Sequence, residues 1–238
     1  MTETKALDPR ALAVAIPAYQ AAPTIGDVVG RTLALLPEVL VIDDGSDDDT
    51  AGCARRAGAE VISQPENRGK GDALELAFET LFARGFEAVI TLDADGQHLP
   101  EEIPELIRAA AGADLVLGNR THLFEGMSRL RRLSNSLSSR AISLVAGAAV
   151  GDVQTGFRLY ARRLIAATGF PEARFEAESA VVVRAARRGF RIVSVPVRLG
   201  FADGRTTSHY RPVIDSLRIA VAVTRARFEG HARRGGQT

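Results

Sequence analysis

Short apolar segments alternate with helix-like segments from residue 12 to residue 118 of this chain. The apolar segments have the composition of buried strands. Repeated strand–helix units predict an α/β fold with a mostly parallel central sheet, and such sheets bind ligands beyond the carboxyl ends of their strands. We expect strands at 12–16, 39–42, 60–63, 88–92 and 114–118, and helices at 24–36, 50–57, 72–84 and 100–110.

Two aspartates at alternate positions, Asp93 and Asp95, follow the fourth expected strand, with Gly96 and Gln97 behind them. On an extended chain, residues two positions apart point the same way, so both carboxylates can face one point. Adjacent carboxylates repel each other and favour a cation between them, and all-oxygen ligands suit Mg²⁺ or Mn²⁺. We therefore predict a metal site formed by Asp93, Asp95 and Gln97, with a solvated acidic turn as the alternative.

Polar or aromatic residues follow other expected strands as well. Pro17 and Tyr19 follow the first strand, Asp43 and Asp44 follow the second, and Arg120 follows the fifth. Because these positions are all carboxyl ends of strands, we expect the side chains to share one site with the two aspartates of the predicted metal site. No G-x-G-x-x-G follows the first strand, and the glycines around residue 70 lack the spacing of a P-loop, which argues against a dinucleotide dehydrogenase or a P-loop NTPase.

The two halves of the chain carry opposite charge, although the net charge is only +1. Residues 1–119 hold 9 Lys and Arg against 21 Asp and Glu, whereas residues 120–238 hold 21 basic residues, all arginine, against 8 acidic ones. Arginine binds phosphate in a bidentate manner and tolerates partly dry interfaces. An acidic, metal-binding half joined to an arginine-rich half suits two phosphorylated substrates, or one substrate and an anionic surface.

Together these motifs resemble the family 2 glycosyltransferases, which are inverting enzymes with a nucleotide-sugar-binding domain of the GT-A type. The match is fullest to the branch of polyprenyl-phosphate (dolichyl-phosphate) mannose and glucose synthases, and it covers about residues 10–225. The matching segments are Pro17 with Tyr19, Asp43 to Ser46, Asn67 to Gly71, Asp93 to Gln97, Gly118 to Arg120, and Thr155 to Arg158.

The resemblance implies a donor site for a GDP- or UDP-hexose and a divalent metal ion. Tyr19, after Pro17, would stack on the nucleobase, and Asp43 or Asp44 would accept a hydrogen bond from the base or the ribose. Arg68 and Lys70, in a glycine-flanked loop, would meet the diphosphate or the base. The segment Asp93-Ala94-Asp95 would hold the donor through the metal, which would neutralise the charge on the departing nucleoside diphosphate.

The resemblance also implies a polyprenyl phosphate as the acceptor. A phosphate monoester has its second pKa near 6, so it needs to be held by cations and needs no general base. The arginines that would hold it are Arg120, Arg131 or Arg132, Arg158, and Arg205 with Ser208 nearby. The family often has Ser-Lys where this chain has Ser208-His209.

Other functions stay open at this point. The same fold can act on a hydroxyl acceptor, which needs a carboxylate base, and Asp152, Glu176 and Glu178 are the candidates. A sugar-1-phosphate nucleotidyltransferase would carry a glycine-rich signature near the first strand, and residues 13–22 contain no glycine. A non-enzymatic module would bind a nucleotide sugar or another anion without turnover.

The expected domain organisation follows from the motifs and from the charge difference between the two halves. We expect one domain over 8–228, with a nucleotide-sugar-binding half at 8–120, a helical, arginine-rich acceptor half at 121–228, and a disordered tail at 229–238. Residues 192–197 would add a strand to the sheet, and 212–228 would form a helix that either lies in a membrane interface or packs on the domain. The arginine-punctuated segment 125–150 is the other candidate for membrane contact.

The expected cellular setting is the cytoplasm, with peripheral attachment to the cytoplasmic face of the membrane. No segment approaches the roughly 20 apolar residues that span a bilayer, and the first residues lack the apolar core of a signal peptide. The single cysteine, Cys53, allows no intrachain disulfide. We expect no nucleic-acid partner and allow for a homodimer or a membrane-protein partner.

Overall fold

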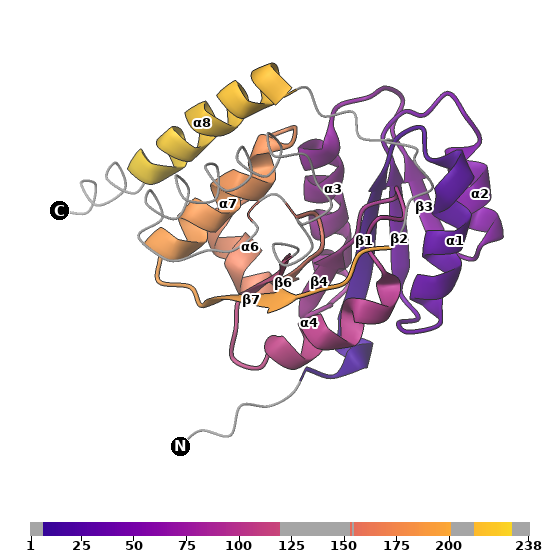
Figure 1. The fold of residues 1–238 in the computed structure, drawn as a ribbon, viewed down its shortest axis with the longest axis horizontal. Helices are drawn as coiled ribbons and strands as arrows, with labels where there is room; N and C mark the ends of the chain where they lie inside the picture. Colours follow the sequence, from indigo (N-terminus) through magenta and orange to yellow (C-terminus); the bar gives the residue numbers. More distant parts are fainter. Residues whose placement is uncertain (1–6, 120–152, 154, 201–211, 230–238) are drawn as a thin grey trace.

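A seven-stranded sheet forms the centre of the protein, in the order β3-β2-β1-β4-β6-β5-β7 (Figure 1). The computed structural model describes residues 7–119, 153, 155–200 and 212–229. The strands are β1 (Leu12–Ala18), β2 (Val39–Asp43), β3 (Glu60–Ser63), β4 (Ala88–Thr91), β5 (Leu115–Asn119), β6 (Arg158–Ala161) and β7 (Ile192–Pro196). Neighbours are parallel except where β6 pairs with β4 and β5, so the predicted mostly parallel sheet is confirmed.

Helices connect the strands much as the sequence predicts. They are η1 (Pro9–Ala11), α1 (Ala22–Leu33), α2 (Thr50–Arg56), α3 (Lys70–Ala83), η2 (Pro100–Glu102), α4 (Ile103–Ala109), α6 (Arg162–Thr168), α7 (Glu176–Arg187) and α8 (Pro212–Phe228). The ends of the expected helices shift by a few residues, and α3 begins at Lys70, two residues before the expected start. The strand β6 and the helix α6 were not expected, because four residues opening on an arginine carry little strand signal.

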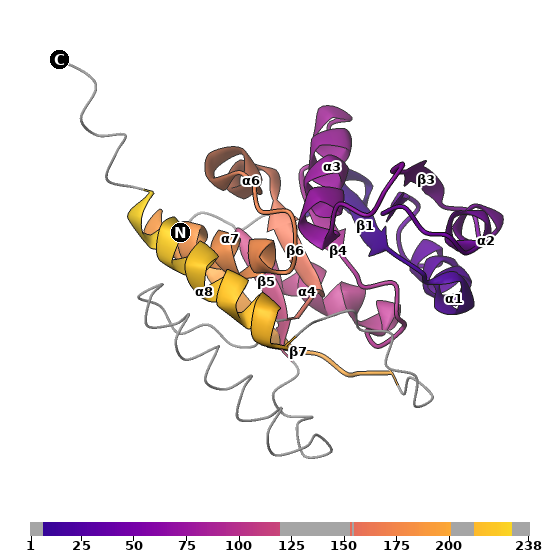
Figure 2. The ribbon, with the colours of Figure 1, turned by 90° about the horizontal axis from the view of Figure 1, so that it is seen from above.

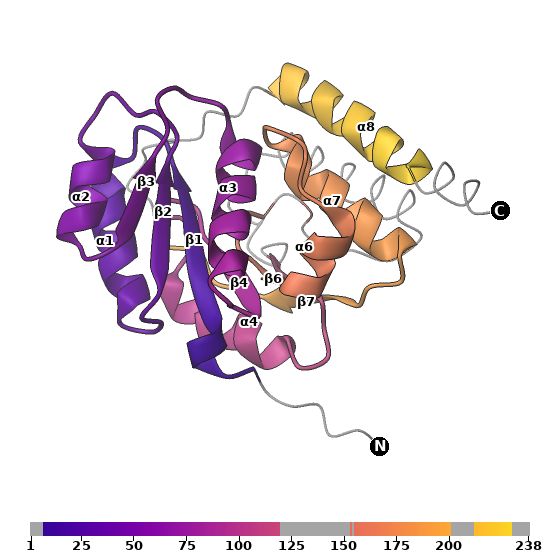
Figure 3. The same cartoon turned by 180° about the vertical axis from the view of Figure 1, so that it is seen from behind.

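The sheet separates two apolar cores, since alternate residues of each strand point to opposite faces. In β1, Ala13 and Ala15 belong to the core on the side of α3, α7 and α8. Leu12, Val14 and Ile16 belong to the core on the side of α1 and α4. Figures 2 and 3 show these helices around the sheet, with α3 in front of β1 and β4 in Figure 3. Both cores therefore support the same strand ends, where the candidate site lies.

The helix α8 packs on α7, which is one of the two arrangements expected for residues 212–228. Its residues Ile219, Ala222, Val223 and Ala226 are buried in the core that also contains α7. Near the end of this helix, Arg184 of α7 pairs with Glu229 at 2.8 Å and also with Glu172. Within the described residues, no helix is long and apolar enough to cross a membrane.

Three aromatic rings hold α3 to the second half of the sheet. Phe78 of α3 is buried, and its ring centroid lies 5.0 Å from that of Tyr160 in β6. The ring of Phe170 completes the group at 5.1 Å from Phe78. Both contacts have the edge-to-face geometry that aromatic pairs favour.

We predict that Phe78→Ala lowers the free energy of unfolding by about 3–5 kcal/mol, because the lost ring leaves a cavity between α3 and β6. Urea denaturation followed by circular dichroism would measure the change. Leu35→Ala, at a side chain that is 38% exposed, is the control and should change stability by less than about 0.5 kcal/mol. Equal effects of the two substitutions would contradict the packing described for Phe78.

Candidate active site

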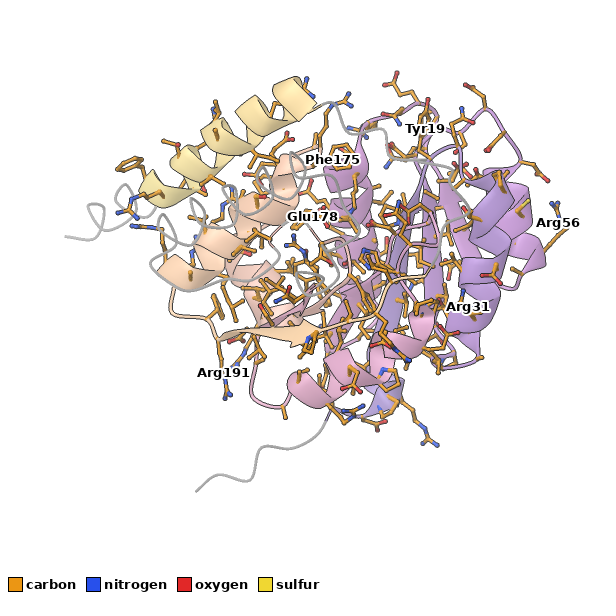
Figure 4. All side chains as sticks on the ribbon, viewed as in Figure 1. Tyr19, Arg31, Arg56, Phe175, Glu178 and Arg191 are labelled. Carbon is orange, nitrogen blue, oxygen red and sulfur yellow. The ribbon has the colours of Figure 1, made fainter. Side chains whose placement is uncertain are left out.

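The structure brings the residues that follow β1, β2 and β4 to one edge of the sheet. β1 pairs in parallel with both β2 and β4, with Ala18 beside Asp43. Tyr19 and the segment that begins at Asp93 therefore leave the sheet at the same edge, and Figure 4 shows Tyr19 there. Glu178 of α7, labelled in Figure 4, is buried in the interior of the molecule.

Asp93 lies at the centre of a compact polar cluster. The ammonium of Lys70 lies 2.7 Å from Asp93 Oδ1, and Nε2 of His98 lies 3.5 Å from Oδ2. Gly156 covers the same carboxylate so closely that a Cβ atom there would lie 2.3–2.5 Å from it. Thr91 Oγ1 fixes this glycine by donating to its carbonyl at 2.8 Å. The carboxylate is thus enclosed by a cation, an imidazole and a strand-linked glycine.

Lys70 joins this cluster to the second half of the chain. Its ammonium donates to Oε1 and Oε2 of Glu178 at 3.1 and 3.0 Å. Glu178 is buried in the first turn of α7, and Lys70 itself is the first residue of α3. The start of α3, the end of β4 and α7 therefore meet at one buried ammonium group.

The charges of this cluster favour its ionised form. Burial alone would raise the pKa of Asp93, but the charge of Lys70 and the hydrogen bond from His98 hold that pKa well below its usual range. Burial alone would lower the pKa of Lys70, but the charges of Asp93 and Glu178 raise it above its usual value. Lys70 and Asp93 are therefore an ion pair at neutral pH.

Asp95 has a different environment from Asp93. Burial, and then the negative charge of Asp93, raise the pKa of the Asp95 carboxyl. Within the described residues, the backbone amide of Gln97 is the group that bonds this carboxylate, at 2.9 Å from Oδ1. A partly buried carboxylate beside another negative charge is stabilised by an added cation.

The residues here fit a divalent metal ion that is completed by a ligand. Among the described residues, no group of three or more His, Cys, Asp or Glu side chains can hold a metal on its own. Asp95 and Gln97 offer oxygens, and Mg²⁺ in particular is usually bound by one or two carboxylates together with substrate phosphates. Asp93 is less available, since both its oxygens already face cationic or hydrogen-bonding partners.

The loops beside Tyr19 are held by Asp43 and Asp44, two aspartates that the sequence also singles out. Asp44 accepts the backbone amides of Arg68 and Gly69 at 2.7 and 2.8 Å, and Asp43 Oδ1 accepts that of Ser46 at 3.1 Å. Burial raises the pKa of Asp44, although these amides oppose the shift. Both carboxylates thus shape the loops beside Tyr19, as turn-forming aspartates do.

Further contacts tie the first helix to this edge. Thr24 donates from Oγ1 to the carbonyl of Ala94 at 2.7 Å, which fixes the residue between the two aspartates. Pro17 lies in β1, and Tyr19 is partly buried just beyond it. The side chain of Arg68 is 58% exposed and pairs with Asp72 at 3.5 Å, so it lies at the rim of the site.

Arg158 does not lie where an acceptor could meet it. Its side chain is fully buried, and it donates to the carbonyls of Thr155, Glu178 and Val153 at 2.7, 2.6 and 2.7 Å. The guanidinium thus holds the segment of Gly156 against the start of α7. This burial corrects the expectation that Arg158 contacts the acceptor: in the described structure its role is to support the site.

Several predicted residues lie outside the described part of the chain. These are Arg120, Arg131, Arg132, Asp152, Arg205 and Ser208. Conversely, no pattern in the sequence marks His98 or Gly156 as a neighbour of Asp93. His98 follows Gln97 directly, but only the fold shows that its ring turns back to Asp93, packed 5.5 Å from the ring of Phe157.

Comparison with known proteins identifies the family. The family model described as "Glycosyl transferase family 2" matches residues 13–169. The chain belongs to glycosyl transferase family 2. A Haloferax volcanii protein described as a dolichyl-phosphate hexose transferase is 36% identical over 200 residues, covering 82% of this chain and 85% of that protein. A Mycolicibacterium smegmatis protein described as a polyprenol monophosphomannose synthase is 32% identical over 200 residues, covering 77% of this chain and 75% of that protein.

Solved structures show the same fold. Glucosyl-3-phosphoglycerate synthase from Mycobacterium tuberculosis, crystallised with Mn²⁺, UDP and phosphoglyceric acid, superposes with a TM-score of 0.72 at 20% identity, covering 92% of this chain and 79% of that chain. The predicted GT-A fold and the predicted family are both confirmed, and this family 2 protein is a glycosyltransferase.

We predict that Gly156→Ala lowers sugar transfer by about 100-fold, because its Cβ would displace the Asp93 carboxylate. Initial rates at saturating donor would measure the loss. Gly30→Ala is the matched control, since a Cβ at this exposed position of α1 meets no atom within 4 Å, and its rate should equal that of the parent. Full activity of Gly156→Ala would contradict the close approach to Asp93.

We also predict that Lys70→Met lowers the free energy of unfolding by about 3–5 kcal/mol, because it leaves the buried Glu178 and the partly buried Asp93 without their shared cation. Urea denaturation would measure the loss. Combining it with Glu178→Gln should return part of the stability, since the second change removes one uncompensated charge. Arg56→Met, in an exposed pair with Asp49, is the control and should cost less than about 1 kcal/mol.

Proposed function

We propose that this family 2 glycosyltransferase inverts the anomeric centre while moving a hexose from a GDP- or UDP-sugar to a polyprenyl phosphate, with Mg²⁺ or Mn²⁺. The observation that carries the proposal is the unequal pair of aspartates: Asp93 is neutralised by Lys70, whereas Asp95 lacks a counter-ion among the described residues. Such a pair attracts a metal-bound diphosphate to the edge of the sheet.

The donor would lie across the carboxyl ends of β1, β2 and β4. Tyr19 would stack on the base, the loops fixed by Asp43 and Asp44 would surround the ribose, and Arg68 at the rim would meet the diphosphate. Asp95 and Gln97 would hold the metal, and Asp93 would join them on release of Lys70. When bound, the ion would offset the negative charge that develops on the departing diphosphate.

A phosphate acceptor simplifies what the protein must do. It is largely a dianion at neutral pH, so the chain has to orient it rather than deprotonate it. Arg120, one of Arg131 and Arg132, and Arg205 with Ser208 are the proposed holders, because arginine binds phosphate in a bidentate manner. The relatives described as dolichyl-phosphate hexose transferase and polyprenol monophosphomannose synthase support this choice of acceptor. The fold shared with a protein crystallised with Mn²⁺ and UDP supports the donor.

A hydroxyl acceptor is the second candidate, and one observation favours it. Oε2 of Glu176 is buried without a hydrogen-bond partner in the described structure, so this carboxylate has unused acceptor capacity. Glu178 is a weaker base candidate, because both its oxygens bind Lys70. In this alternative, Glu176 or Asp152 would remove the proton of the hydroxyl.

The test is transfer of radiolabelled sugar from a panel of GDP- and UDP-sugars into a butanol-extractable polyprenyl phosphate. We expect label with one donor in Mg²⁺ or Mn²⁺, none after EDTA, and a loss of about 100-fold or more in Asp95→Ala. Asp27→Ala, at an exposed carboxylate of α1, is the matched control and should transfer normally.

Other outcomes separate the candidates. Metal-dependent hydrolysis of a donor without labelled lipid would favour the hydroxyl acceptor, and Glu176→Gln should then abolish transfer to a hydroxyl. Binding of a donor without any turnover would contradict both candidates.

A further inference from the structure

The helix α8 presents two different faces. One face, with Ile219, Ala222, Val223 and Ala226, is buried against the domain. The opposite face carries Arg218, Val221, Arg225 and Phe228, whose spacing of three and four residues places them on one side of a helix. We call these four residues the outward face of α8.

Large apolar side chains are unusually exposed on this face. Val221 is 57% exposed and Phe228 is 64% exposed, and across the described residues the other exposed large apolar side chain is Leu35. Residues 218–229 also contain three arginines, at 218, 225 and 227. Glu229, the acidic residue of this stretch, is paired with Arg184 at 2.8 Å. The outward face therefore combines apolar side chains with positive charge.

The position of α8 in the fold places its outward face at the same end of the molecule as the candidate active site. Figures 1 and 3 place α8 toward the end of the molecule to which β1 and β2 run, and Figure 4 places Tyr19 at that end. A surface bound by α8 would thus lie at the same end of the molecule as the sheet edge that Asp93 and Asp95 follow. An apolar and cationic surface is complementary to an anionic lipid bilayer, which offers phosphates to arginine and an acyl boundary to Phe and Val.

We propose that the outward face of α8 docks on an anionic lipid bilayer, with Val221 and Phe228 entering the interface and Arg218 and Arg225 meeting headgroup phosphates. This inference deepens the proposed function, on which it rests for the lipid character of the acceptor. With only two apolar side chains, docking is reversible and depends on salt, because the arginine contribution is screened.

The experiment is co-sedimentation of the full chain with vesicles of phosphatidylglycerol and phosphatidylcholine at low salt. We expect binding that weakens about tenfold in Phe228→Gln and about fivefold in Arg225→Gln, and that is lost in vesicles of phosphatidylcholine alone. Leu35→Gln, at the exposed apolar side chain after α1, should bind like the parent. Failure of the parent to bind anionic vesicles would overturn the proposal.

A second readout keeps this inference separate from the proposed function. Sugar transfer to a short-chain, water-soluble polyprenyl phosphate should be unchanged in Phe228→Gln, whereas transfer to a long-chain acceptor in vesicles should fall. Loss of transfer to the soluble acceptor would overturn a docking role for Phe228. Sedimentation that shows a dimer of the parent and a monomer of Phe228→Gln would also overturn the proposal, since a second copy would then cover this face.

Discussion

The buried ammonium of Lys70 is the interaction on which the rest of the site depends. It lies between Asp93 and Glu178, so it neutralises the carboxylate at the end of β4 and joins it to α7. Such a group is costly to bury unless it is paired, which makes the two carboxylates and the ammonium a unit. Burial and the charge of Asp93 raise the pKa of the neighbouring Asp95, so an added cation would stabilise the ionised form of this carboxyl.

Close backbone approaches make this unit possible. A Cβ at Gly71 would lie 2.0 Å from the carbonyl of Glu172, and one at Gly69, whose φ is +108°, would lie 2.6 Å from that of Ala173. These glycines let the start of α3 lie directly against the chain before α7. Gly156 acts in the same way on the other side of Asp93. The polar cluster is therefore set by main-chain contacts as much as by side chains.

The sequence predicts the parts of this arrangement that repeat along the chain. Apolar periodicity gives the strands and helices of the first half, and the rule for parallel sheets brings Tyr19, Asp43 and Asp93 to one edge. The sequence does not predict the contacts that depend on tertiary packing. Arg158 resembles a phosphate ligand in sequence, yet its five N–H donors are as well suited to buried carbonyls. The partnership of Lys70 with Glu178 joins residues 108 positions apart, which no local pattern reveals.

The reversed strand β6 has a consequence for how this fold can be divided. Because β6 is antiparallel to β4 and β5, the chain before it must enter the sheet at the edge where those strands end. That entry brings Gly156 onto Asp93, so a residue of the second half forms one wall around a residue of the first. The two halves are thus interlocked rather than modular. Exchanging halves between relatives at residue 120 would place each Asp93-Ala94-Asp95 segment against a glycine-containing segment from another protein.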